Sequence, residues 1–486
     1  MKLPLGKNNS ISSILGPVST LSKKIGNKSI LITAVVIIGA LIADTALEKI
    51  AGLIGAQSSG GDMNLALFII ISVVAYGIGQ YLVLSFIKNR NNRIINAVER
   101  KTGNKGRFVL TQRVVFITQY VLTAMLISVI LIVIFGSYYS SSQLIFSIVV
   151  SYGLAIFLLG LLSIRFFSWY RSNRNLVVLS YGFACAIITA NLVLGATFMI
   201  LALWNHTPDI RAHVGTSYTI FSPDSVMGVL YSSYTASGII SFLSMWVSTA
   251  LLLRNHARKL GRIKFWLMVV IPLAYFMTPF IPSLLSQIVT PLMRSDPLFA
   301  AILFTMIFAA SKPVGGILFG IAFWTVARAV RESTIIRDYM IMSALGVVAL
   351  FVSLQGDVVA AYYPPFGLVT VSYVGLSSFM MIVGLYSSAM SVSEDDNIRK
   401  SIRKNAIEES KLLDSIGTAQ MGQEIERKVT EIERKVMEMA KEDADNLEIK
   451  TGVKPSLEEP DMKKYLEEVM QEVSLSIKSK QPRRSG

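Results

Sequence analysis

Three ionisable residues interrupt long apolar segments of the chain: Asp44, Lys312 and Asp357. In hydrocarbon a charge at mid-helix costs roughly 2.5–3.5 kcal/mol, so each of these residues needs a partner or a route to water. Counted at ~1.5 Å per residue from the cytosolic end expected for its segment, each lies ~22–26 Å deep. Two carboxylates and one ammonium at a common depth predict an intramembrane polar cluster, in which each charge offsets the burial of another.

A position at the outer membrane surface is the alternative for both carboxylates. Asp44 lies just before Glu48 and Lys49, and Asp357 is close to the outer end of its own segment. Interfacial exposure explains such residues without any site. Lys312 is central in its segment, and two roles stay open for it: a functional residue or the structural partner in an ion pair.

A helix break is expected directly after Lys312, at Pro313, Gly315 and Gly316. Proline removes a backbone hydrogen bond and kinks a helix. The segment 298–328 is also about ten residues longer than a straight span requires. Close helix packing is the other explanation for the glycines, because Gly316 and Gly320 are spaced as a packing pair.

The preceding segment, 265–292, is irregular as well and contains four prolines: Pro272, Pro279, Pro282 and Pro291. Two adjacent broken helices are typical of the midplane substrate site of a transporter. The matching breaks that an inverted repeat requires are missing from the first half of the chain, which weakens this interpretation.

Residue types that support enzyme chemistry are scarce. The chain has one cysteine and three histidines. It contains no phosphate-binding loop, no His-Glu-x-x-His and no Gly-x-Ser-x-Gly. We therefore expect no enzyme activity, no catalytic or metal-binding residues and no cofactor. The basic loops follow from membrane topology and do not imply binding of nucleic acid.

The composition places most of the chain in a lipid bilayer. Hydrophobic residues make up 52% of the sequence, charged residues only 16%, and mean hydropathy is +0.55, whereas a soluble domain has roughly a quarter charged residues. An all-α polytopic membrane protein is predicted, because a spanning helix needs about 20 mostly apolar residues. Ten segments satisfy that requirement: 29–51, 64–87, 114–136, 143–166, 175–204, 226–253, 265–292, 298–328, 340–360 and 367–392.

The distribution of Lys and Arg predicts how these segments cross the membrane. Every second connection between the segments is basic: 23–28, 88–113, 165–174, 254–264 and 328–339. The connections between these contain only two basic residues, Arg211 and Arg294. Basic short loops stay on the cytoplasmic side, so both termini are expected inside the cell. The predicted organisation is a flexible basic leader at 1–28, a ten-helix membrane domain at 29–392 and a cytosolic helical tail at 393–486.

The tail carries one regular pattern. The heptad EIERKVT at 424–430 is followed by EIERKVM at 431–437, and apolar residues recur at a spacing of 4-3-4-3, namely Ile425, Val429, Ile432, Val436 and Met439. This spacing is the seam of a coiled coil and predicts one at 424–439. The tail either pairs with a copy of itself or a cytosolic partner, or folds against the basic inner loops. A linker is expected at 444–459, which contains Gly452 and Pro455.

The junction of membrane domain and tail resembles known sequences. Residues 362–404, YYPPFGLVTVSYVGLSSFMMIVGLYSSAMSVSEDDNIRKSIRK, together with KLLDSIGTAQM after them, resemble uncharacterised polytopic membrane proteins from archaeal genomes. The resemblance covers mainly 362–421. It implies an archaeal plasma-membrane location and no activity.

Two functions are compatible with these patterns. The first is a sensory, signalling or scaffold protein that couples a multi-helix membrane domain to a cytosolic helical tail. The alternative is a secondary transporter or channel with a site near Lys312 and the broken segments 265–292 and 298–328.

Overall fold

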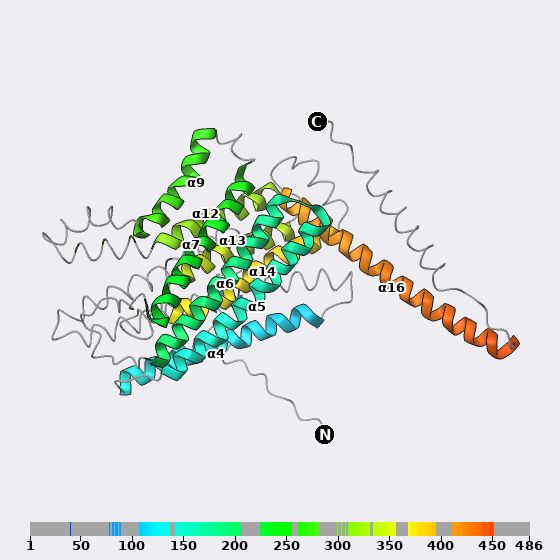
Figure 1. Cartoon of the computed structure of the whole chain (residues 1–486), viewed down its shortest axis with the longest axis horizontal. Helices are drawn as coiled ribbons and strands as arrows, with labels where there is room; N and C mark the ends of the chain where they lie inside the picture. Colours follow the sequence, from blue (N-terminus) through cyan, green and yellow to red (C-terminus); the bar gives the residue numbers. More distant parts are fainter. Residues whose placement is uncertain are drawn as a thin grey trace, which may run out of the picture.

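The computed structural model describes residues 106–136, 141–205, 224–254, 261–280, 310–330, 334–355, 368–394 and 411–451, with a few residues elsewhere, most of them between 77 and 88 (Figure 1). These stretches form α4 (Gly106–Gly136), α5 (Ser141–Asn173), α6 (Leu176–Asn205), α7 (Val226–Leu253), α9 (Arg262–Met277) and the 3₁₀ turn η2 (Thr278–Phe280). They continue with α12 (Ser311–Ala329), α13 (Thr334–Ser353), α14 (Leu368–Glu394) and α16 (Lys411–Thr451). All of these elements are helical, which confirms the predicted all-α class for this part of the chain.

Seven helical stretches within the described residues are long and apolar enough to cross a membrane: Gln112–Val129, Ser142–Asn173, Leu176–Trp204, Val226–Leu253, Arg262–Phe280, Ile335–Ser353 and Thr370–Ser393. Each overlaps one of the ten predicted spans. The predicted spans 29–51 and 64–87 lie outside the described residues, except for Gly39 and for a few helical residues between 77 and 87. The predicted span 298–328 overlaps α12, whose apolar character is lowered by Lys312 and Arg328 near its two ends.

Six helices form a closed ring, in which each packs on the next in the order α5, α6, α7, α12, α13 and α14, and α14 returns to α5. Helix α9 packs on α12, and α4 packs on α5 and α14. Within the spanning stretches of α13 and α14, 78% of the residues are buried, a far larger share than in the other spanning helices. These two helices are therefore the most enclosed members of the ring.

Aromatic side chains fill the interior between α6, α7, α12 and α13. Phe319 lies between Phe242 and Phe351, with ring centroids 5.3 and 4.8 Å away. Tyr181 of α6 contacts Phe323 of α12 at 5.4 Å. All five side chains are buried. This packing links the two halves of the ring through large apolar surfaces.

The helices are longer at the basic end than the apolar segments predicted. Helix α5 continues through most of the predicted connection 165–174, and only Arg174 and Asn175 separate it from α6. Arg174 has a φ of 48°, and its amide donates to the carbonyl of Tyr170 at 2.6 Å. Hydropathy marks where side chains are apolar, whereas backbone hydrogen bonding carries a helix beyond that boundary until a left-handed residue ends it.

The tail helix also differs from the sequence prediction. Helix α16 runs without interruption to Thr451, so the expectation of a linker from residue 444 was wrong for 444–451. The residues there tolerate a helix, and the first strong helix breakers in the sequence are Gly452 and Pro455.

Candidate functional site

Two groups of polar side chains in the described bundle lie at helix ends: one where α12 begins beside the end of α13, and one where α16 meets α5 and α14. The first place contains Lys312. The second lies at the carboxyl ends of α5 and α14, on the side of the bundle where the basic connections are predicted.

Helix α12 begins at Ser311, one residue before Lys312. Ala310 precedes it in a turn and supplies no side-chain cap, and the amide of Val314 donates to the carbonyl of Ala310 at 3.0 Å. Within the described residues, Pro313 therefore lies in the first turn of α12, where its missing N–H breaks no intrahelical bond, and Gly315 and Gly316 lie inside the regular helix.

Both glycines are points of close approach. A Cβ added to Gly315 would collide with the ring of Phe242 on α7, and one added to Gly316 would lie 2.9 Å from Cβ of Phe351 on α13. Gly320 approaches α13 in the same way, because a Cβ added to Gly320 would lie 3.1 Å from the carbonyl oxygen of Ala344. Small residues allow membrane helices to pack this closely. Packing therefore accounts for these glycines directly.

Lys312 joins α12 to the end of α13. Its Nζ donates to the backbone carbonyl of Leu354 at 2.6 Å, and the hydroxyl of Ser311 donates to Oε1 of Gln355 at 3.3 Å. A cation beside the last carbonyls of a helix is stabilised by the helix dipole and satisfies an acceptor that lacks an intrahelical partner. Asp44 and Asp357, the predicted partners of Lys312, lie outside the described residues, so the polar cluster stays a prediction.

The second place is the amino-terminal part of α16. Leu412, Leu413, Ile416 and Ala419 are buried, and α16 packs on α14, α5 and α6. A Cβ added to Gly417 would lie 2.7 Å from Cβ of Val392 on α14. The first part of the tail helix therefore packs into the bundle as closely as the spanning helices do.

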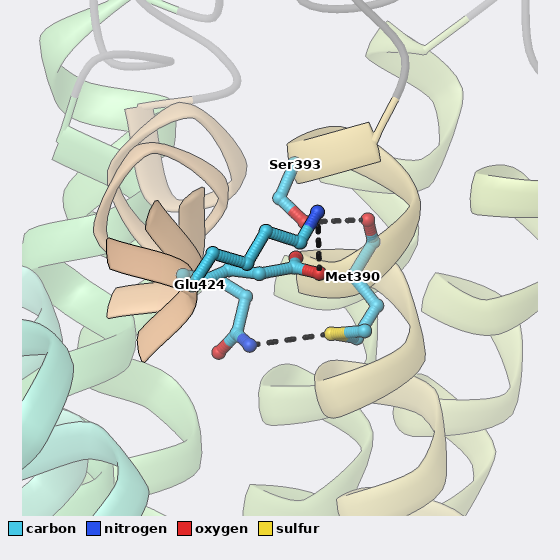
Figure 2. A network of polar contacts seen from close by, with 5 residues as sticks. Met390, Ser393 and Glu424 are labelled. Carbon is cyan, nitrogen blue, oxygen red and sulfur yellow. Dashed lines mark hydrogen bonds and ion pairs between the residues drawn. The ribbon is translucent and has the colours of Figure 1, made fainter. Parts of the chain in front are cut away.

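One amide side chain connects three helices at this interface. The indole N–H of Trp169 on α5 donates to Oε1 of Gln420 at 3.1 Å, and Nε2 of Gln420 donates to Sδ of Met390 on α14 at 3.2 Å. Figure 2 shows Met390 and Ser393 at the end of α14 facing the turn of α16 that carries Glu424. Trp169 and Gln420 are both buried. Their hydrogen bonds are therefore shielded from water, which raises the cost of breaking them.

Further hydrogen bonds hold α16 to the last turns of α5. Asn173 Nδ2 donates to the carbonyl of Ser415 at 3.1 Å, and Gln423 Nε2 donates to the hydroxyl of Ser168 at 2.7 Å. We call this interface the tail dock and define it as Ser168, Trp169, Asn173, Met390, Val392, Ser415, Gly417, Gln420 and Gln423.

Aromatic contacts continue from the tail dock into the membrane domain. Trp169 lies edge-on to Phe166 at 5.4 Å and stacks on Tyr386 of α14 at 6.5 Å. The guanidinium of Arg165 lies 5.5 Å from the centre of the Tyr386 ring, within the range of a cation–π contact. The tail dock is thus part of the same packed structure that joins α5 to α14.

Beyond Gln423 the character of α16 changes, and the helix runs away from the bundle (Figure 1). Ion pairs at i,i+4 follow its surface: Glu424–Lys428 at 3.7 Å, Glu431–Lys435 at 3.2 Å and Arg434–Glu438 at 3.8 Å. In the seam, Ile432 is 58% exposed and Met439 is 56% exposed, while Ile425, Val429 and Val436 are half-buried. We call residues 424–451 the projecting half of α16.

Trp169 and Gln420 were not predicted from the sequence. The signal for them was the segment LLDSIGTAQMG, a run of apolar and small residues inside a tail that is otherwise highly charged. Such a run is typical of a helix that packs closely on another. No pattern in the sequence identifies α5 and α14 as its acceptors.

Comparisons with protein-family models, with curated proteins and with solved structures found no match to this chain.

Proposed function

We propose that this chain is a sensory, signalling or scaffold protein of the plasma membrane, in which α16 conveys the arrangement of the membrane helices to a cytosolic partner. One observation carries the proposal: a single helix of 41 residues is docked at one end and carries an apolar seam at the other. The docked end touches both α5 and α14. A change in the relative position of those two helices therefore has to be absorbed by α16.

Ten spans with both termini in the cytosol form the topology on which this proposal rests. The seven apolar helices among the described residues support a multi-pass domain, and the basic connections favour the cytosolic placement of the tail. The resemblance of 362–421 to archaeal polytopic membrane proteins supports the plasma membrane as its location.

The length of α16 turns small shifts at the tail dock into large displacements. Between Gln420 and Met439 the helix extends ~28 Å, so a tilt of ~10° at the dock moves the distal seam by ~5 Å. A displacement of that size is enough to open or close a contact with a partner helix, whose side chains interlock at a fixed register.

The test measures whether the tail dock orients the projecting half. Spin labels are attached at Arg171→Cys and Arg434→Cys, both exposed, in full-length protein in nanodiscs, diluted with unlabelled chain. The proposal predicts one narrow distance distribution, which Gln420→Ala broadens. Arg427→Ala, on the exposed side of α16 beyond the dock, is the matched control and should leave the distribution unchanged. Equal widths for wild type and Gln420→Ala would contradict the proposal.

Secondary transport or channel activity is the second candidate, and one observation favours it. The start of α12 and the end of α13 meet at Lys312, and helix ends inside a membrane domain supply backbone groups for binding ions or substrates. On this account Lys312→Met removes the currents that proton, cation or anion gradients drive through wild-type proteoliposomes, while Lys312→Arg retains part of them. Unchanged currents in folded Lys312→Met would exclude Lys312 from transport.

A further inference from the structure

The seam of the projecting half has a defined heptad register. Its spacing of 4-3-4-3 places Ile425, Ile432 and Met439 at d positions and Val429 and Val436 at a positions. The positions that flank such a seam, e and g, decide which helix pairs with it and in which direction.

Charges at the flanking positions are separated by sign. In this register the g positions are basic, at Lys428 and Lys435, and the e positions are acidic, at Glu426 and Glu433. In a parallel pair each g residue faces the e residue of the next heptad on the other chain, so Lys428 meets Glu433 of the second copy. In an antiparallel pair g faces g and e faces e, which brings like charges together.

The described side chains of this surface are accessible to another helix. The side chains of Lys428 and Lys435 are 65% and 60% exposed, although each already pairs with a glutamate of its own helix. Exposed pairs at i,i+4 are weak, so exchange for a partner across the seam costs little. Ile432 and Met439 present apolar surface beside them.

We propose that the occupant of this seam is a second copy of the chain, parallel and in register over 424–439. The inference rests on the proposed function, because it names the partner of the same tail. Two copies in one membrane have the same orientation, and the tail dock points their projecting halves in the same direction.

The first test is disulfide cross-linking of the full-length protein in native membranes. Met439→Cys places a thiol at a d position, and Arg434→Cys places one at the outward f position as the matched control; Cys185, the native cysteine, is buried. Mild oxidation should cross-link two chains through Met439→Cys and not through Arg434→Cys. Met439 distinguishes the two directions of pairing. In a parallel pair in register it faces Met439 of the second copy, whereas in an antiparallel pair centred on the same seam it faces Ile425. Cross-linking of differently tagged Met439→Cys and Ile425→Cys chains, or no cross-linking of Met439→Cys, would overturn the proposal.

The second test reverses the charges without changing the apolar seam. Lys428→Glu and Glu433→Lys should each weaken self-association roughly tenfold, because two attractive contacts become repulsive. A mixture of the two variants restores attraction at both contacts and should associate as wild type does. Equal association of the single variants and the mixture would show that these charges do not select the partner.

Failure of this inference is distinguishable from failure of the proposed function. A chain that stays monomeric while its labelled α16 shows the narrow, Gln420-dependent distance distribution excludes self-pairing and retains the docked tail. A broad distance distribution in the wild type would show that the dock does not orient α16. The geometric reason for parallel pairing would then be lost as well.

Discussion

At the residue scale, glycines set how closely the two central helices approach. A Cβ added to Gly384 on α14 would lie 2.5 Å from the carbonyl oxygen of Tyr339 on α13, and one added to Gly346 would lie 2.8 Å from the amide nitrogen of Met381. In each case the obstacle is backbone, which cannot rotate away as the end of a side chain can. The crossing of α13 and α14 is therefore fixed at both glycines.

We predict that Gly384→Ala destabilises the membrane domain by about 1–3 kcal/mol, because α13 and α14 must separate to admit one methyl group. The free energy of unfolding in mixed detergent micelles measures this effect. Gly153→Ala on α5 is the control: nothing lies within 4 Å of a Cβ at that position, so the substitution should be neutral or slightly stabilising. Equal stability of the two variants would show that the crossing is looser than described.

The environment of Lys312 could be predicted in part from the sequence. Its position in an apolar segment indicated that it needs a partner, and the structure gives it the carbonyl of Leu354. The sequence also predicts the carboxylates of Asp44 and Asp357 as partners, and this part of the prediction lies outside the described residues. A contact with the end of another helix could not be predicted, because the sequence does not show which helix ends lie together. Leu354 directly follows Ser353, the last residue of α13, inside the predicted span 340–360, so Lys312 makes this contact at a helix end.

At the scale of elements, α16 consists of two parts with different physical support. The part before Glu424 is held by buried apolar side chains and by the hydrogen bonds of the tail dock. The projecting half has i,i+4 ion pairs, each worth only about 0.3–0.5 kcal/mol. An isolated helix with such support is marginal in water, so partner binding is expected to stabilise it.

We predict that the two parts respond differently to truncation. A chain that ends after Gln423 keeps the tail dock, and its thermal unfolding temperature in detergent should stay close to that of the full-length protein. A chain that ends after Ser410 exposes Trp169 and Val392, which α16 covers, and should unfold at a clearly lower temperature. Equal unfolding temperatures for both truncations would contradict a stabilising role of the dock.

The elements themselves were largely predictable from the sequence, and their contacts were not. Apolar runs of about 20 residues identify spanning helices because hydrocarbon leaves the backbone few alternatives. Where a helix ends depends on local signals such as the left-handed Arg174, which hydropathy does not register. The tail dock depends on shape, for example on Gly417 fitting against Val392, and such a fit appears only once the helices are packed.

At the scale of the whole molecule, the ring of six helices and the docked tail form one packed body. The hydrophobic core runs continuously from Phe242 and Phe351 in the middle of the ring to Leu412 and Ile416 at the start of α16. Side chains that pack in this way transmit displacement, since they have little free volume in which to absorb it. Signalling through α16 requires that this body crosses a membrane with the tail inside the cell.

The sidedness of the tail is the most direct test of that requirement. Cysteines are placed at Val226, which is 79% exposed at the predicted outer end of α7, and at Arg434, whose side chain is 73% exposed on α16. With a membrane-impermeant thiol reagent on intact cells, we expect labelling of Val226→Cys and no labelling of Arg434→Cys, whereas both are labelled once the membranes are disrupted. Labelling of Arg434→Cys from outside intact cells would contradict the cytosolic placement of the tail.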